Sequence, residues 1–110
     1  MYAINKNLIK INGVLVDTFE RDVICGQTAL AVEAGTTGYK GSACRDTGGR
    51  TYVSIECMCG DFNFSPVKDT EGNAVGVKIA CCGDDALNAI MHALEFAKQA
   101  INDQRCHVED

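Results

Sequence analysis

The segment from Gly35 to Tyr52 holds the residue types best suited to chemistry with a ligand. It combines five glycines, four threonines and two tyrosines with three cations, and its one acid, Asp46, leaves it at +2 in a chain of net charge −5. A glycine-rich loop exposes backbone N–H groups, hydroxyl groups donate beside them, and Lys or Arg adds charge-assisted hydrogen bonds. The segment therefore predicts binding of an anion, with phosphate as the best match.

Tyrosine rings in the same segment could also stack on a nucleobase, an interaction worth about 1–3 kcal/mol. The alternative is a long polar connection between two strands, in which the glycines serve only the turns. We favour ligand binding because long ordered loops in compact domains are usually functional. The segment is neither a P-loop nor a dinucleotide fingerprint, since both spacings are missing and no helix follows the glycines. The candidate ligand contacts are Gly35, Thr36, Thr37, Gly38, Tyr39, Lys40, Arg50 and Tyr52.

Catalytic chemistry has much weaker support in the sequence. No Ser or Cys stands in a nucleophile motif with a nearby base, and no paired carboxylates flank a credible cleft. His92 falls on the polar side of a predicted helix and His107 near the end of the chain, where a lone imidazole is most often a surface residue. We expect a binding protein without catalytic residues.

The cysteines raise a further alternative, in which their thiolates bind a zinc ion. The spacing argues against it, because paired zinc ligands usually stand two to four residues apart on one side of the ion. Cys81 and Cys82 are adjacent and would point to opposite faces of a strand. With an odd number of cysteines and no signal peptide, we expect reduced, buried thiols and neither a metal nor another cofactor. The seven cysteines are Cys25, Cys44, Cys57, Cys59, Cys81, Cys82 and Cys106.

The elements that must position the Gly35 to Tyr52 segment are short strands. Asn12-Gly13, between alternating apolar runs at 8–11 and 14–16, is typical of a type I′ hairpin turn. Alternation also predicts strands at 28–33 and 51–57, and a second hairpin whose strands carry Phe62 and Phe64 on one side and residues 75–81 on the other.

A helix is predicted from Asp84 or Asp85 to about Gln104, because carboxylates favour a helix start and apolar residues then recur at helical spacing. One stripe would pack on the sheet, and a second would pack either in a broad core or against another subunit. The first stripe is Leu87, Ile90, Met91, Leu94, Ala97 and Ile101, and the second is Ala89, Ala93, Phe96 and Ala100. We expect the second stripe to form a homo-oligomer interface, a dimer or higher, with the ligand pocket at or near the subunit boundary.

Together these elements predict an α+β fold, an antiparallel β-sheet of hairpins packed by one long C-terminal amphipathic helix. The 110 residues suit one domain, 1–110. A net charge of −5 disfavours polymeric nucleic acid and anionic membrane as partners. The sequence has neither a signal peptide nor an apolar run long enough to cross a membrane, so we expect a cytoplasmic protein.

The Gly35-Thr36-Thr37-Gly38 turn, the glycine-rich stretch that ends in Gly49-Arg50-Thr51-Tyr52, and the C-terminal helix after Gly83 together resemble the first Thoeris anti-defence family of phage proteins. The resemblance covers roughly residues 32 to 104. It implies a homo-oligomeric sponge, possibly a hexamer, that captures a cyclic ADP-ribose isomer in the bacterial cytosol without cleaving it, or captures cyclic oligonucleotides. By this resemblance Thr36, Thr37 and Arg50 are ligand contacts. The chain departs from the family in its many cysteines and in the two aspartates at the helix start.

A different class of function fits the same composition. An acidic phage protein could inhibit a host defence enzyme directly by covering a basic surface. A sponge would carry a small nucleotide that heating releases, whereas an inhibitor would co-purify with a protein.

Overall fold

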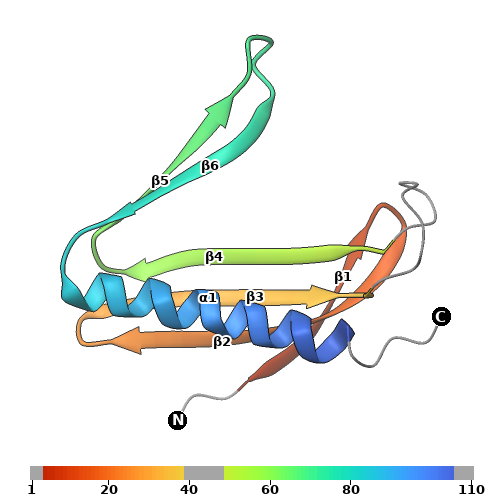
Figure 1. Cartoon of the computed structure of the whole chain (residues 1–110), viewed down its shortest axis with the longest axis horizontal. Coiled ribbons are helices and arrows are strands. Elements are labelled where there is room, and N and C mark those ends of the chain that lie inside the picture. The colour runs from red at the N-terminus through yellow and green to blue at the C-terminus, as the bar shows by residue number, and fades with distance from the viewer. Residues whose placement is uncertain (1–3, 39–48, 106–110) are drawn as a thin grey trace.

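The computed structural model describes residues 4–38 and 49–105, and within them six antiparallel strands in two sheets pack against one C-terminal helix. The fold is α+β, as predicted from the sequence (Figure 1). Strands β1 to β4 form a four-stranded sheet in chain order, and β5 and β6 pair only with each other. The elements are β1 (Asn5–Ile11), β2 (Val14–Cys25), β3 (Thr28–Thr36), β4 (Thr51–Cys59), β5 (Phe62–Lys68), β6 (Ala74–Cys81) and α1 (Asp84–Arg105).

The first hairpin turns at Asn12-Gly13 as predicted. Both residues have positive φ angles, 47° and 83°, which a type I′ turn requires. Strand β2 runs much farther than the apolar run at 14–16 suggested, because it pairs with β1 through its first part and with β3 through its second. Charged residues such as Asp17 and Arg21 interrupt its apolar pattern and hide this length from a periodicity argument.

The core lies between α1 and one face of the four-stranded sheet, and small side chains form the helical half of it. Leu30, Val32 and Ala34 of β3 are fully buried beneath the helix, and Val23 of β2 lies beside them. Alanine has little volume beyond the backbone, so an alanine stripe lets a helix lie close to a sheet. The buried alanines of α1 are Ala86, Ala89, Ala93, Ala97 and Ala100.

This packing corrects the two stripes assigned to the helix from the sequence. Leu87, Met91 and Leu94, expected on the sheet, are 52%, 59% and 55% exposed. Ala89, Ala93 and Ala100, expected at an oligomer interface, are buried against the protein's own sheet, so that assignment is wrong. Phe96 is half-buried and packs at the edge of the core. Helical spacing correctly predicted two apolar stripes, but spacing alone does not say which of them is closer to the sheet.

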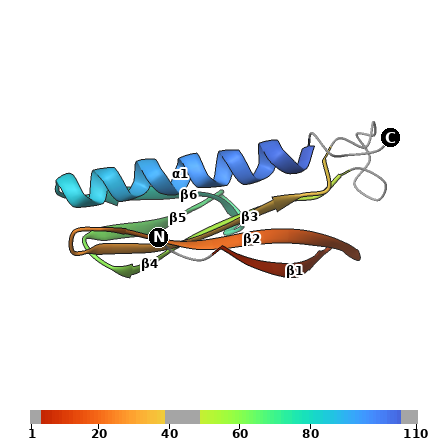
Figure 2. The same ribbon diagram turned by 90° about the horizontal axis from the view of Figure 1, so that it is seen from below.

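The second hairpin, β5–β6, is confirmed and projects from the main sheet as an arm (Figure 1). We use the word arm for residues Phe62 to Cys81. All eight residues of β6 are exposed, whereas Phe62 at the base of the arm packs against the core. The molecule is flat, with extents of 43 × 42 × 17 Å, since the arm widens it without adding a layer (Figure 2).

The helix begins directly after Gly83, whose φ of 100° turns the chain out of β6. Asp84 and Asp85 stand in its first turn, as predicted, and Asp85 accepts a hydrogen bond from the backbone N–H of Gln27 at 3.4 Å. No helix in the described part of the chain has the length and apolar character needed to cross a membrane.

Candidate functional site

The two ends of the predicted ligand-binding segment lie side by side at one end of the sheet. Thr36 is the last residue of β3, and Thr51 is the first of β4; their hydroxyl oxygens are 2.9 Å apart. Thr37 donates its N–H to the carbonyl oxygen of Arg50 at 2.9 Å, and its hydroxyl accepts from the N–H of Arg50 at 2.8 Å. These bonds close the base of the segment. Tyr39 and Lys40 lie outside the described residues.

Close backbone packing explains two glycines of this segment. A Cβ atom on Gly35 would lie 2.1 Å from the carbonyl oxygen of Asp17, and one on Gly49 would lie 2.2 Å from that of Gly38. Gly35 therefore needs glycine for packing of β3 against β2, and Gly49 for the close approach of the two chain segments that follow β3 and precede β4. For Gly35 and Gly49, the structure thus supports the alternative reading of the sequence, in which the glycines have a structural role and do not bind a ligand.

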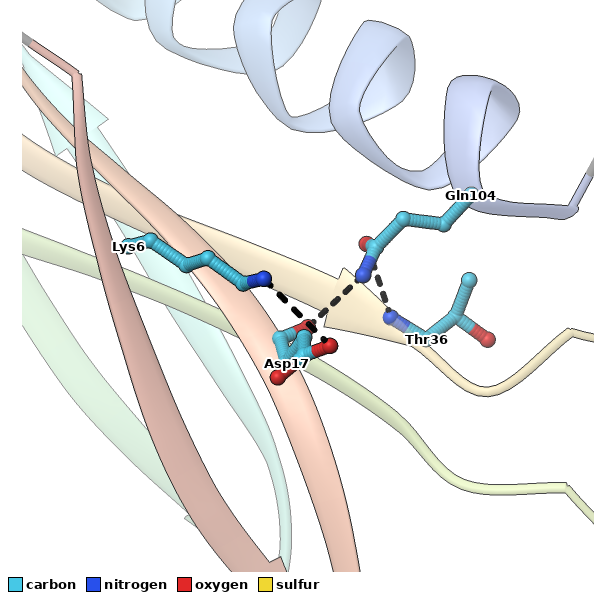
Figure 3. A network of polar contacts seen from close by, with 4 residues as sticks. All are labelled: Lys6, Asp17, Thr36 and Gln104. Carbon is cyan, nitrogen blue, oxygen red and sulfur yellow. Dashed lines mark hydrogen bonds and ion pairs between the residues drawn. The ribbon is translucent and has the colours of Figure 1, made fainter. Parts of the chain in front are cut away.

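The end of α1 is fastened to the same region through Gln104 (Figure 3). The side-chain oxygen of Gln104 accepts from the N–H of Thr36 at 3.1 Å, and its amide nitrogen donates to the carbonyl oxygen of Asp17 at 2.8 Å. Asp17 also forms an ion pair with Lys6 of β1 at 3.8 Å. One side chain thus joins the helix to β2 and β3.

The predicted contacts separate onto two faces of the sheet. Thr36 and Thr37 lie on the side that α1 covers. Tyr52 pairs with Gly35 and, by strand alternation, faces away from the helix. Arg50 is only 6% exposed, and its Nε donates to the carbonyl oxygen of Ile11 at 3.3 Å. The structure therefore gives Arg50 a structural contact with the β1–β2 turn and does not bring it together with Thr36 and Thr37 around one cavity.

A large groove lies on the α1 side, between the helix and strand β2. Its volume is about 1160 Å³, and Thr36 and Thr37 border one end of it. The groove exists because α1 covers β3 and the second part of β2, whereas β1 lies farther from the helix (Figure 2). Phe19 of β2 and Phe96 of α1 supply aromatic walls.

Arg21 is the one Lys or Arg among the described residues that line this groove. Its guanidinium carbon lies 6.0 Å from the centre of the Phe96 ring, a cation–π contact. Its Nε is buried, and in the described part of the chain it has no hydrogen-bond partner. A buried donor without a partner destabilises a protein by about 1–3 kcal/mol, so this arginine is held beside the groove at a cost in stability.

Sequence reasoning missed Arg21, although a signal was present. Phe19, Arg21 and Val23 alternate along β2, and Phe19 and Val23 belong to the side of the sheet that packs under the helix. Arg21 therefore lies between two core residues on the apolar face of β2. A charged side chain at such a position is unusual and indicates a possible functional role. The charge-rich run around it made this part of β2 resemble a surface segment.

Carboxylates surround the rest of the groove. Asp17 is paired with Lys6, and Asp103 accepts from the side-chain amide of Gln99 at 2.8 Å. Asp22 and Glu95 also line the groove. Such oxygens accept hydrogen bonds from sugar hydroxyls and from base amino groups, so a ligand with one anionic group beside Arg21 and hydroxyl or amino donors elsewhere would match the lining.

The cysteines differ in part from the expectation of burial. Cys25 and Cys57 are half-buried, and Cys59, Cys81 and Cys82 are exposed, all as free thiols. Exposure follows from their position at the base of the arm, where the main sheet ends. Over residues 4–38 and 49–105, no three His, Cys, Asp or Glu side chains gather in a way that could hold a metal ion. Cys44 and Cys106 lie outside the described residues.

Comparison with protein-family models gave no match, and neither did comparison with curated proteins or with solved structures.

Proposed function

We propose that the protein is a non-catalytic binding protein that sequesters a small nucleotide in the groove between α1 and strand β2. The observation that carries the proposal is Arg21, a cation held over the Phe96 ring with a buried Nε that has no partner among the described residues. An anionic group in the groove beside Arg21 would pair with the charge of the guanidinium group.

The size of the groove supports a ligand of nucleotide scale. Small-molecule pockets have volumes of about 300–1000 Å³. The groove, at about 1160 Å³, is slightly larger than this range and suits a ligand with two nucleoside units. A smaller metabolite would leave much of it filled with water.

The lining supports the same class of ligand. Arg21 is placed to bind a phosphate, and Phe19 and Phe96 offer faces on which a base can stack. Asp22 and Glu95 can accept from ribose hydroxyls or base amino groups. In this proposal Arg21 replaces Arg50 as the cation that contacts the ligand, and Thr36 and Thr37 remain at the border of the site.

The resemblance to the Thoeris anti-defence family supports a cyclic ligand and its biological setting. We therefore propose capture of a cyclic ADP-ribose isomer, or of a cyclic oligonucleotide, in the cytosol of a phage-infected bacterium. Sequestration requires tight binding and no bond cleavage, and Arg21, Phe19 and Phe96 are the residues that would supply the binding contacts.

A thermal-shift comparison tests this function. The ligands are cyclic ADP-ribose isomers, linear ADP-ribose, and cyclic di- and trinucleotides. A ligand at 100 times its Kd should add about 2.7 kcal/mol to the free energy of unfolding. Mass spectrometry after heating should recover it intact. Stabilisation by no member of the panel would refute the nucleotide proposal, and a cleaved ligand would refute sequestration.

A direct inhibitor of a host enzyme is the second candidate, and the carboxylates of the groove favour it. Asp17, Asp22, Glu95 and Asp103 could receive a basic segment of a partner protein. The two functions separate when the protein is purified from infected cells. A sponge releases a small nucleotide on heating, whereas an inhibitor carries a second polypeptide.

A further inference from the structure

Strand β4 has a free edge on the side where the arm leaves the sheet (Figure 1). It is the last strand of the four-stranded sheet and, within the described chain, pairs only with β3. Thr37 donates its N–H to the carbonyl oxygen of Arg50, so by alternation the even-numbered residues of β4 bond to β3. Val53 and Ile55 therefore point their backbone N–H and C=O groups out of the sheet.

Strand β5 has a free edge too. Cys82 donates its N–H to the carbonyl oxygen of Asp61, so by the same alternation the odd-numbered residues of β5 bond to β6. Phe62, Phe64 and Pro66 therefore turn their backbone groups away from β6. Proline has no N–H, and at this edge the missing donor leaves the β5–β6 ladder intact. Two consecutive strands of the chain thus each have one open edge.

The short connection between these strands places the two edges in register. Only Gly60-Asp61 separates β4 from β5, and two residues are the commonest connection in a β-hairpin. Counted outward from this connection, Cys57 is opposite Phe64, and Ile55 is opposite Pro66. All four residues turn backbone groups to a free edge, so the two edges can form a ladder.

The side chains of the arm match those of β4 on both faces. On the helix side of the sheet, Ile55 and Cys57 pack against the core, as does Phe62 at the base of the arm. By alternation Phe64 and its pair Ile79 continue this apolar face along the arm. The polar residues on the opposite face are Ser54 and Glu56 of β4 and Asn63, Ser65 and Lys78 of the arm. Pairing of β4 with β5 would therefore extend one apolar face and one polar face.

The helix presents exposed apolar side chains toward the same place. Leu87, Met91 and Leu94 are each more than half exposed, and we call them the outer helix face. Leu87 precedes Phe96 by about two and a half helical turns, so it points away from the groove that Phe96 lines. Because α1 lies over β3 and the groove is on the β2 side, the outer helix face points toward β4 and the arm.

We propose that the arm is a hinged flap that closes onto the free edge of β4 and joins the two sheets into one sheet of six strands. Figure 1 shows the open form. In the closed form, the apolar face of the arm lies beside the outer helix face, so both surfaces leave water together. A two-stranded hairpin alone is at most marginally stable in water, and burial of apolar surface favours closure.

The base of the arm has the two hinges that this motion requires. Gly60, with a φ of 127°, stands between β4 and β5, and Gly83, with a φ of 100°, stands between β6 and α1. Glycine adopts such angles readily, and a few residues of this kind absorb the backbone change in hinge motions. The arm adds no layer to the molecule (Figure 2), so a rotation at these two points brings it alongside β4.

The flap goes beyond the ligand-binding function and does not depend on it. It closes on the side of α1 opposite the groove and leaves Arg21 uncovered. Pro66 sets the strength of closure, because its missing N–H leaves the carbonyl oxygen of Ile55 without a partner in the β4–β5 ladder. Closure is therefore weaker than pairing through a complete ladder.

Nuclear magnetic resonance on the isotopically labelled full chain, in reducing buffer, tests closure. Glu56 and Ser65 form a non-hydrogen-bonded pair of the closed ladder, with Cα atoms about 4.5 Å apart. Their Hα protons should give a strong nuclear Overhauser effect. The N–H of Ile55, which donates to Pro66 in the closed form, should be protected from hydrogen exchange. In a mixture of labelled and unlabelled protein, the effect should be absent between copies, because the contact lies within one chain.

Substitutions on the arm should shift the balance between open and closed forms. Val77→Lys should lower the protection of Ile55 roughly tenfold or more, because closure would bury an unpaired charge. Ala80→Lys is the matched control, with the same change in charge on the polar face of the same strand, and should keep the wild-type protection. Pro66→Val supplies the missing donor and should raise the protection.

Circular dichroism checks that each variant is folded, and Leu94→Glu on the outer helix face replaces Val77→Lys if that variant is not. Three results would each overturn the flap. The first is a wild type without the effect between Glu56 and Ser65. The second is equal protection of Ile55 in the charged variant and in Ala80→Lys. The third is an effect seen only between labelled and unlabelled copies.

Discussion

At the scale of single residues, Gln104 makes the most specific connection in the molecule. Its amide links Thr36 of β3 and the backbone of Asp17 in β2 to the last turns of α1, at 3.1 and 2.8 Å. Both partners are backbone groups, so a substitution at Gln104 leaves a donor and an acceptor unmatched at the end of the sheet beside the groove.

We expect Gln104→Ala to lower the free energy of unfolding by about 1–2 kcal/mol, because two hydrogen bonds to backbone groups are lost. For a domain of this size, the Tm would fall by roughly 5–15 °C. Gln99→Ala, which removes only a contact with Asp103 on the surface of the helix, should change stability by less than about 0.5 kcal/mol. Equal Tm values for the two variants would show that the Gln104 bonds contribute nothing.

The residue scale is also where the sequence was least informative. Thr36, Thr37 and Arg50 were predicted to act together, but Thr36 and Thr37 border the groove, whereas Arg50 is buried and its Nε donates to the carbonyl oxygen of Ile11. Arg21 was missed because its importance depends on Phe96, which is 75 residues later in the chain. Spacing along one segment cannot show that two distant segments share a cavity.

At the scale of elements, the turn of the arm is held by a single carboxylate. Asp69 accepts from the backbone N–H groups of Asn73 at 3.0 Å and Glu71 at 2.9 Å. These hydrogen bonds, with that of Asn73 the stronger influence, hold the pKa of Asp69 below its usual value of 3.8. The ionised form is the one that stabilises the turn.

A pH titration followed by NMR checks this account of the arm. Because the folded-state pKa is lowered, the stabilising contribution is complete above the unfolded pKa and is lost as the pH falls through the folded pKa. The amide shifts of Glu71 and Asn73 should therefore be constant down to about pH 4 and change together with a midpoint below 3.8. In Asp69→Ala the two amides should show no such transition. A midpoint above 3.8 in the wild type would contradict the role of Asp69.

Elements were the level at which sequence reasoning worked best. The Asn12-Gly13 turn, the β5–β6 hairpin and the helix from Asp84 were all predicted, since each follows from turn chemistry or periodicity within a short window. The face of α1 that meets the sheet was predicted only in part. Ala97 is buried and Ile90 and Ile101 pack against the core as expected, but Leu87, Met91 and Leu94 are exposed, and alanines of the second stripe are buried in their place. Close approach of helix and sheet is a tertiary property that the helix sequence alone does not encode.

At the scale of the whole molecule, α1 presents a different surface on each of its two sides. One side holds the groove with Arg21, Phe19 and Phe96, and the other carries the exposed side chains of Leu87, Met91 and Leu94. The small residues of α1, its alanines, are therefore buried against the sheet, whereas three of its larger apolar residues are exposed to solvent.

The central claim is that an anionic nucleotide binds in the groove through Arg21. The most direct measurement is the Kd of the best ligand for Arg21→Gln, by isothermal titration calorimetry, beside Lys78→Gln as a control of equal charge change on the arm. Loss of a charge-assisted hydrogen bond weakens binding by about 1.5–3 kcal/mol, so Arg21→Gln should raise the Kd by roughly 10- to 150-fold. Lys78→Gln should bind as the wild type does. Equal affinity of Arg21→Gln and the wild type, with both proteins folded, would contradict the account.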